Sequence, residues 1–254
     1  MCFGQSEYDL RCEWGLEGLL ALQESADALV IVDVLSFSTA VDIALSRGAS
    51  VLPYRWRDDS AGRFALENGA LLAESRTAGS QYTLSPASLR SISAGTRLVL
   101  PSPNGSTLAL GAGAVPVYTA SLRNAPAVAR RAAAHGPRVA VIPAGEQWRQ
   151  SALRPCLEDL IGAGAVLAEL FGTSSPEAQM AIATFAHFRR DLVGALFRCG
   201  SGKELVQRGF ATDVHLAAEY AVSLVAPFLH RGEFVDHAAD RRPQETNSPN
   251  ADQN

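Results

Sequence analysis

Cysteine and basic charge are both scarce in this sequence. The four cysteines, at positions 2, 12, 156 and 199, form no CxxC pair and no zinc-type spacing. We therefore expect free buried thiols and neither a disulfide framework nor a zinc site. Lys and Arg number 22 against 26 Asp and Glu, so the formal net charge is −4. Because nucleic-acid-binding surfaces need a basic excess or a basic stripe, no nucleic-acid partner is expected.

Long apolar runs are also missing. No stretch reaches the length of a membrane span, so no membrane association is expected. The first residues, MCFGQSEYDLRCEW, lack the basic start and apolar core of a signal peptide. A cytoplasmic protein is the resulting prediction. With 254 residues, 47% of them hydrophobic, the chain is long enough to bury a sizeable core.

Short apolar runs alternate with helical patterns along the first 150 residues. The sequence ALVIVDVL predicts a buried strand over 28–35, and apolar spacing then predicts a helix that ends at Gly48. Further strands are predicted at 50–54, 70–74, 96–101, 115–121 and 138–145, with helices at 58–68 and 125–135, and residues 75–95 are expected to form a surface loop. This alternation is typical of an α/β layered fold with a largely parallel sheet.

The character of the chain changes after Pro155. Helices are predicted from that residue onward and at about 176–197, 201–209 and 212–220, followed by an apolar strand at 222–229. We expect residues 1–235 to form a single domain or two lobes, about 1–150 and 151–235. The polar segment 236–254 should be disordered. The apolar helices of the second half are compatible with a homo-oligomer.

Acidic residues and turns follow several predicted strands. Asp33 ends the first strand and Glu74 the third, while residues 102–106 and 144–149 follow later ones. Ligands of parallel α/β sheets bind beyond the carboxyl ends of the strands, so these segments should share one edge. Carboxylates gathered there would need a cation, and Mg²⁺ prefers such oxygen ligands. The alternative for Asp33 is a helix cap.

Two further segments have both a functional and a structural interpretation. In SPNGST, Asn104-Gly105 favours positive backbone dihedrals, and a helix that starts at Ser106-Thr107 could hold a phosphate. A turn with a simple N-cap fits the same residues, and the segment is not a Walker motif. Glu158 and Asp159 fall in the first turn of a helix, where the helix dipole favours negative charge. Because that helix should be buried, the two carboxylates would be costly without a partner such as a cation.

Serine hydrolysis and histidine-based metal chemistry are not favoured. The five histidines show no metal spacing and no evident triad, and Ser36, Ser38 and Ser201 lack a nucleophile elbow.

Seven segments in register resemble the 2-phosphosulfolactate phosphatase family, over residues 28–235. They are VIVDVLSFSTAVDIALSRGA, NGALLAESR, LSPASL, LPSPNGSTLAL, SLRNAPAVA, AGEQWRQSALRPCLEDLIGAGAV and SGKELVQRGFATDVHLAAEYAVSLVAPFLHRGEF. The resemblance implies a three-layer α/β/α fold with a mostly parallel or mixed sheet. It also implies Mg²⁺-dependent hydrolysis of a phosphate monoester of a small 2-hydroxy acid, which in coenzyme M biosynthesis yields sulfolactate.

The family's functional residues carry over unevenly. Asp33 matches the Asp of the family's Asp-Val-Leu-Arg-Ala segment, and the family's Glu-Asp pair, Asn-Gly turn and Ser-Gly pair fall at residues 158–159, 104–105 and 201–202. In contrast, Ser36 and Thr107 stand where the family has arginines, and Pro143 where it has cysteine. Two missing arginines would weaken the binding of a dianionic phosphate or a sulfonate.

The resemblance predicts the following site. Asp33 and Glu158 are catalytic, and together with Asp159 they hold Mg²⁺. The substrate-binding residues are Ser36, Asn104, Gly105, Ser106, Gly145, Arg149, Ser201, Gly202 and Lys203, of which Arg149 and Lys203 replace in part the missing arginines. The alternative is a catalytically inactive relative that binds a small anion or a partner protein.

Overall fold

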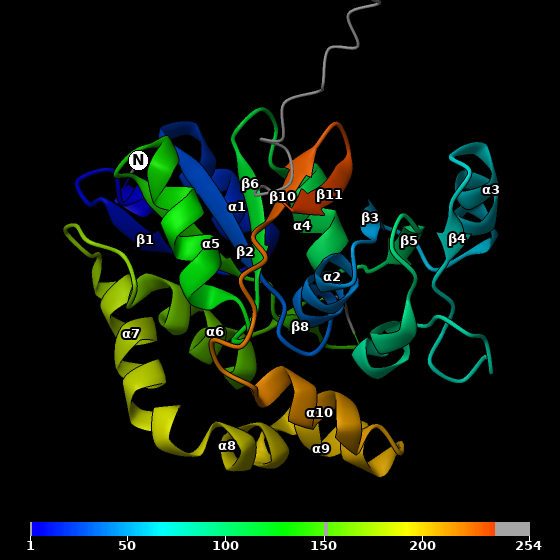
Figure 1. Cartoon of the computed structure of the whole chain (residues 1–254). Coiled ribbons are helices and arrows are strands. Elements are labelled where there is room, and N and C mark those ends of the chain that lie inside the picture. The colour runs from blue at the N-terminus through cyan, green and yellow to red at the C-terminus, as the bar shows by residue number, and fades with distance from the viewer. Residues whose placement is uncertain (1, 150–151, 237–254) are drawn as a thin grey trace, which may run out of the picture.

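A mixed sheet of nine strands forms the centre of the computed structural model, which describes residues 2–149 and 152–236 (Figure 1). Its order is β1-β7-β2-β6-β10-β11-β3-β5-β4. The bounds are β1 Leu10–Cys12, β2 Ala28–Val32, β3 Ser50–Tyr54, β4 Leu71–Leu72, β5 Arg97–Pro101, β6 Val117–Ala120, β7 Val139–Pro143, β10 Pro227–His230 and β11 Glu233–Asp236. The β10–β11 hairpin is antiparallel to both neighbours, and the pairs on either side of it are parallel.

Helices cover both faces of the sheet, which confirms the predicted three-layer α/β/α fold. One face packs against α5 (Ala125–Ala132), α6 (Leu157–Leu167) and α7 (Pro176–Phe188), and the other against α1 (Gly15–Leu22), α2 (Phe37–Ser46) and α4 (Gly105–Gly111). β2 is buried along its whole length, because alternate side chains enter the two cores. Farther along the sheet, α3 (Asp59–Glu67) packs on β5 and β4.

Helices α6 and α7 are in close contact through a small residue. A Cβ atom at Gly164 would lie only 2.0 Å from the carbonyl oxygen of Ala181. The glycine therefore allows the two helix backbones to approach each other. Since α6 is buried on nearly all sides, its acidic first turn is buried with it.

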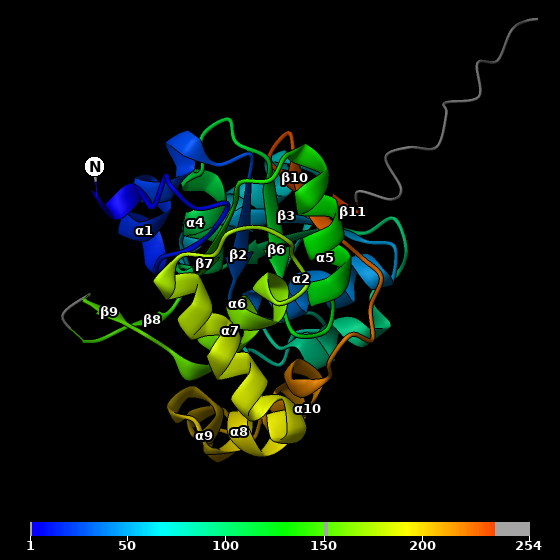
Figure 2. The same ribbon diagram turned by 90° about the vertical axis from the view of Figure 1, so that its left-hand side faces the viewer.

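A second group of helices lies at one end of the sheet. Figures 1 and 2 show α8 (Leu192–Arg198), α9 (Gly200–Gln207) and α10 (Ala211–Ala218) gathered below the strands. The segment after β4 reaches them through a 3-10 helix, Pro86–Ser91, which contacts α10. A small hairpin of β8 (Glu146–Gln147) and β9 (Leu153–Arg154) lies outside the nine-stranded sheet.

Several predicted elements were wrong in extent. The strand expected at 222–229 begins only at Pro227, and the two apolar side chains at 222 and 224 are exposed rather than paired. The helix expected at 176–197 is interrupted by a 3-10 turn, after which Asp191 caps α8. Residue 236 belongs to β11, and the rest of the predicted disordered tail lies outside the described residues.

β1, α1, β11 and the β8–β9 hairpin were not predicted. β10 and β11 lie between β6 and β3, so residues from the second half of the chain complete the sheet. Cys12, Cys156 and Cys199 are free and buried, as expected. Within residues 2–149 and 152–236, no helix has the length and apolar character needed to cross a membrane.

Candidate active site

A cavity of about 390 Å³ opens where four strands end and α9 approaches them. The segments that follow β2, β3, β5 and β7 all contribute to its lining, in agreement with the predicted clustering of these segments. Glu74, which follows β4, is exposed and does not line it. The charged residues that line the cavity are Asp33, Arg57, Arg76, Glu146, Arg154, Glu204 and Arg208.

Asp33 joins two helix starts to the end of β2. Its Oδ1 accepts a hydrogen bond from the backbone N–H of Phe37, 3.3 Å away, and its Oδ2 accepts one from the N–H of Gly105 at 3.1 Å. Burial, together with the negative charge of Glu146, raises the pKa of Asp33 to about 6. Asp33 is therefore both a cap for α2 and α4 and a carboxylate that faces the cavity.

Asp159 lies behind the cavity. Its Oδ1 accepts from the N–H of Val34 and its Oδ2 from the N–H of Gly145, each at 2.8 Å. The side chain thereby ties the end of β2 to the turn after β7. Burial and the charge of Asp33 raise its pKa well above the usual range. Glu158 is also buried, and like Asp159 it is not among the residues that line the cavity.

The turn after β5 differs from the expectation. Asn104 has a φ of −92°, and Gly105 is not one of the glycines with positive φ, so the predicted left-handed conformation was wrong. Gly105 is needed for space instead, because a Cβ atom there would lie 2.2 Å from the Phe37 ring. Ser106 is buried, and its hydroxyl donates to the carbonyl of Leu100.

Asn104 and Glu146 meet at the cavity. The Asn104 amide Nδ2 donates to Glu146 Oε2 at 2.9 Å, which links the turn after β5 to the β8–β9 hairpin. This hydrogen bond orients the Glu146 carboxylate beside Asp33. Glu146 lies in the segment 144–149, which was expected at this sheet edge, but it was not predicted as a site residue.

Four arginines surround the acidic centre. Arg57 follows β3, Arg76 follows β4, Arg154 lies in β9 and Arg208 follows α9. Loss of hydration lowers the pKa of Arg57, the positive charges of Arg76 and Arg208 lower it further, and the carboxylate of Asp33 opposes the change. The cavity therefore concentrates positive charge around the carboxylates of Asp33 and Glu146.

The other predicted substrate residues fall into three groups. Ser36 and Ser201 line the cavity, and each accepts a hydrogen bond from an arginine, Arg76 and Arg154 respectively. Gly145 and Gly202 have packing roles, since a Cβ atom at Gly202 would lie 1.7 Å from a carbonyl oxygen of α8. The remaining two, Arg149 and Lys203, are exposed and are not among the lining residues.

The sequence contained partial signals for the arginines that were missed. Arg57 follows the end of β3, so the rule of strand ends would have found it. Arg76 ends the quoted segment NGALLAESR. Arg154 rather than Arg149 reaches the cavity because the β8–β9 hairpin reverses the chain between them. Arg208 carries no sequence signal, since only the packing of α9 brings it to the cavity.

The predicted metal ligands are not gathered into one site. Within the described ranges, no group of three or more His, Cys, Asp or Glu residues could hold a metal ion. Asp159 directs both oxygens at backbone N–H groups away from the cavity. Asp33 and Glu146 do face it, and Mg²⁺ is commonly held by one or two carboxylates together with water and substrate phosphate. The donor chemistry of this pair fits Mg²⁺, whereas the predicted trio does not.

The fold and the cavity define an α/β protein with an arginine-lined pocket at the strand ends. The family model described as 2-phosphosulpholactate phosphatase matches residues 17–232, and the chain belongs to this family. The predicted family is thus confirmed.

Three curated relatives carry the name "Probable 2-phosphosulfolactate phosphatase". The protein of Symbiobacterium thermophilum is 30% identical over 220 residues, which cover 81% of this chain and 92% of the relative. That of Gloeobacter violaceus is 29% identical over 231 residues, 87% and 96% of the two chains. That of Parasynechococcus marenigrum is 29% identical over 209 residues, 74% and 83%. The enzyme class in these names agrees with the predicted phosphoric monoester hydrolase.

Proposed function

We propose that this protein is a Mg²⁺-dependent phosphatase that hydrolyses a phosphate monoester of a small 2-hydroxy acid, of the 2-phosphosulfolactate type. One observation carries the proposal: a chain of this family has a cavity of about 390 Å³ at the strand ends that is lined by three carboxylates and four arginines. The size suits a small molecule, and the arginines suit an acidic one.

Asp33 and Glu146 would hold the metal in this proposal. When bound, Mg²⁺ supplies Lewis-acid polarisation of the phosphoryl group. Asn104 keeps Glu146 oriented through its amide hydrogen bond, and the two helix starts keep Asp33 fixed. Glu158 and Asp159 then have a structural role behind the cavity, in place of the catalytic and ligand roles predicted from the resemblance.

Arg57 is placed to bind the phosphate. It lines the cavity, where burial lowers its pKa and the negative charge of Asp33 opposes that change. Among the described residues, Arg57 forms no salt bridge that a ligand would have to break. Ser36 and Ser201 add hydroxyl groups to the lining.

The experiment measures phosphate release by the purified protein. 2-Phosphosulfolactate and a panel of phosphorylated 2-hydroxy acids are supplied with Mg²⁺, and then with EDTA. We expect turnover only with Mg²⁺. Absence of turnover with every compound, in protein that circular dichroism shows to be folded, would contradict the proposal.

The second candidate is a catalytically inactive relative that binds a small anion. It is favoured by the replacement of the family's expected residues at Ser36, Thr107 and Pro143. Thermal-shift measurements with Mg²⁺, phosphate and sulfolactate separate the two, since a ligand that binds only the native state must stabilise it. Stabilisation without turnover would support the inactive relative. A cytoplasmic location, a link to coenzyme M biosynthesis and homo-oligomer formation stay predictions from the sequence.

A further inference from the structure

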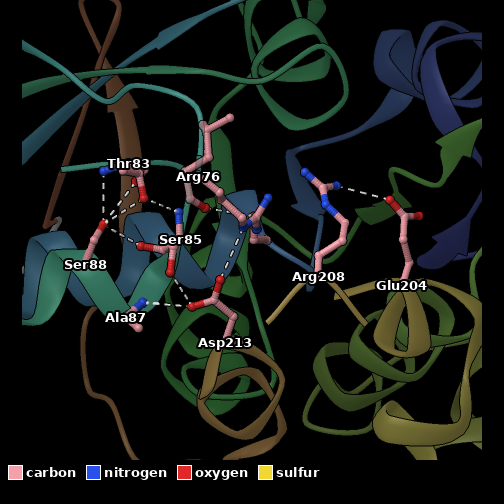
Figure 3. Close-up of polar contacts among 10 residues, drawn as sticks. Arg76, Thr83, Ser85, Ala87, Ser88, Glu204, Arg208 and Asp213 are labelled. Carbon is pink, nitrogen blue, oxygen red and sulfur yellow. Dashed lines mark hydrogen bonds and ion pairs between the residues drawn. The ribbon is translucent and has the colours of Figure 1, made fainter. Parts of the chain in front are cut away.

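Arg76 is held at the cavity by a buried partner from α10. Its Nε lies 3.2 Å from Asp213 Oδ2 (Figure 3). One of its terminal nitrogens donates to Ser36 Oγ at 2.5 Å. Asp213 is 1% exposed, and its other oxygen accepts from Ser85 Oγ and the N–H of Ala87. A guanidinium has five N–H donors. These two hydrogen bonds fix Arg76 and leave its other donors for a ligand.

Arg208 is held much more loosely. Its Nη1 lies 3.2 Å from Oε1 of Glu204, one helical turn earlier, and both side chains are at least half exposed. Both also line the cavity. Exposed pairs of this kind contribute at most about 1 kcal/mol, so an incoming anion can displace Glu204 from Arg208 at little cost.

One aromatic ring connects the two arginines. The guanidinium carbon of Arg76 lies 5.7 Å from the centre of the Phe210 ring, and that of Arg208 lies 5.9 Å from it. Arginine stacks well on aromatic rings, so Phe210 holds both groups in the same part of the cavity. Phe210 immediately precedes α10, and Asp213 lies in the first turn of that helix. This short segment therefore brings together two arginines that are 132 positions apart in the sequence (208 − 76).

The cavity thus has two unlike walls. The strand-end wall is formed by Asp33, Arg57, Asn104 and Glu146. It contains the two carboxylates proposed to bind the metal and the arginine proposed to bind the phosphate. The arginine wall, formed by Arg76, Glu204 and Arg208, comes from the segment after β4 and from α9. Its two arginines are close enough to Arg57 for their positive charges to lower the pKa of that residue. Arg76 has a buried partner and Arg208 an exposed one, so Arg208 is the arginine that can exchange its carboxylate for an incoming anion.

We propose that Arg76 and Arg208 form a clamp for the second acidic group of the substrate, its carboxylate or sulfonate, and that Asp213 is the residue that positions Arg76. The inference rests on the proposed function, because it takes the phosphate to bind at the strand-end wall. Planar guanidinium groups match the paired oxygens of carboxylates and sulfonates.

The test compares a substrate that has a second acidic group with one that lacks it. We expect Arg208→Gln to lower kcat/KM for 2-phosphosulfolactate at least about tenfold more than for p-nitrophenyl phosphate, through KM rather than kcat. Asp213→Asn should produce the same split with a smaller change. Arg208→Lys, which keeps the charge but loses the planar fork, should restore part of the loss. Arg130→Gln, an exposed arginine on α5, is the matched control.

Equal losses on both substrates would overturn the clamp while leaving the phosphatase proposal intact. If the wild-type protein hydrolyses neither compound, the clamp is tested by the thermal shift that sulfolactate produces. A shift in the wild type that Arg208→Gln abolishes would support the clamp although the proposed activity fails. No shift in the wild type, or an equal shift in the variant, would overturn the clamp as well.

Discussion

The two walls of the cavity are built on different principles. On the strand-end wall, Asp33 is 6% exposed and each of its oxygens accepts a backbone hydrogen bond. On the arginine wall, Arg208 forms an exposed ion pair with Glu204. Buried polar groups that are fully bonded hold one geometry, whereas exposed pairs rearrange easily. Under the proposed function, the strand ends would fix the reacting groups, and the exposed pair of Arg208 and Glu204 would rearrange when the substrate binds.

The largest effect on activity is expected on the strand-end wall. Asp33→Asn and Glu146→Gln should each lower phosphate release at least about hundredfold, because each removes a charged oxygen ligand or proton carrier. Both should also lose the stabilisation that Mg²⁺ gives the wild type in a thermal-shift assay. Glu67→Gln, an exposed change on α3, is the control. A response to Mg²⁺ that is unchanged in Asp33→Asn would show that this residue is only a cap.

The largest effect on stability is expected behind the same wall. Asp159→Ala leaves the N–H groups of Val34 and Gly145 without their partner. Each unsatisfied buried donor costs about 1–3 kcal/mol, so the loss of two partners should lower the free energy of unfolding by about 2–6 kcal/mol. Urea denaturation measures the difference, with Asp59→Ala, an exposed acid on α3, as control. A loss below about 1 kcal/mol would mean that Asp159 does not connect β2 to the turn after β7.

The rigid wall should also make stability depend on pH. The native state raises the pKa of Asp33 from 3.8 to about 6, so it holds that proton more tightly than the unfolded chain does. This contribution is fully present below pH about 4 and is lost as the pH rises to about 6. One pKa unit corresponds to about 1.4 kcal/mol, so the loss is about 3 kcal/mol.

Denaturation in EDTA between pH 4 and 7 tests this pH dependence. The wild type should lose stability with rising pH more steeply than Asp33→Asn, which has no proton to release at that site. Parallel curves for the two proteins would contradict the raised pKa.

Two of the four residues of the strand-end wall, Asp33 and Asn104, were predicted from the sequence, and the arginine wall was not. Local patterns mark β2, because its apolar run ends at a carboxylate, and they mark the turn at Asn104. The same local reasoning grouped Asp159 with Asp33, because it could not show that Asp159 turns its oxygens toward backbone N–H groups. It also missed β1, where the buried Arg11 interrupts an apolar pattern and bonds to Ser25 instead.

The arginine wall depends on contacts between distant segments. Arg76 was assigned to a surface loop, but that segment is anchored by Asp213 of α10, 137 positions later. Arg149 and Lys203 were predicted from their place in matching motifs, yet the hairpin and α9 present Arg154 and Arg208 to the cavity instead. Spacing along the chain carries no information on such juxtapositions, since the packing of whole helices decides them.

The smallest effect is expected at Glu204. Its carboxylate lines a cavity proposed to bind a multiply charged anion, and it occupies Arg208 in the free protein. Glu204→Gln removes that competition and one repulsive charge, so KM for 2-phosphosulfolactate should fall about two- to fivefold, within the range of an exposed ion pair. Unfolding free energy should change by less than about 0.5 kcal/mol. Adding salt should narrow the difference in KM, because the pair is exposed and therefore screened. A KM that rises in Glu204→Gln would instead assign Glu204 a direct contact with the substrate, and the arginine wall would then be as fixed as the strand ends.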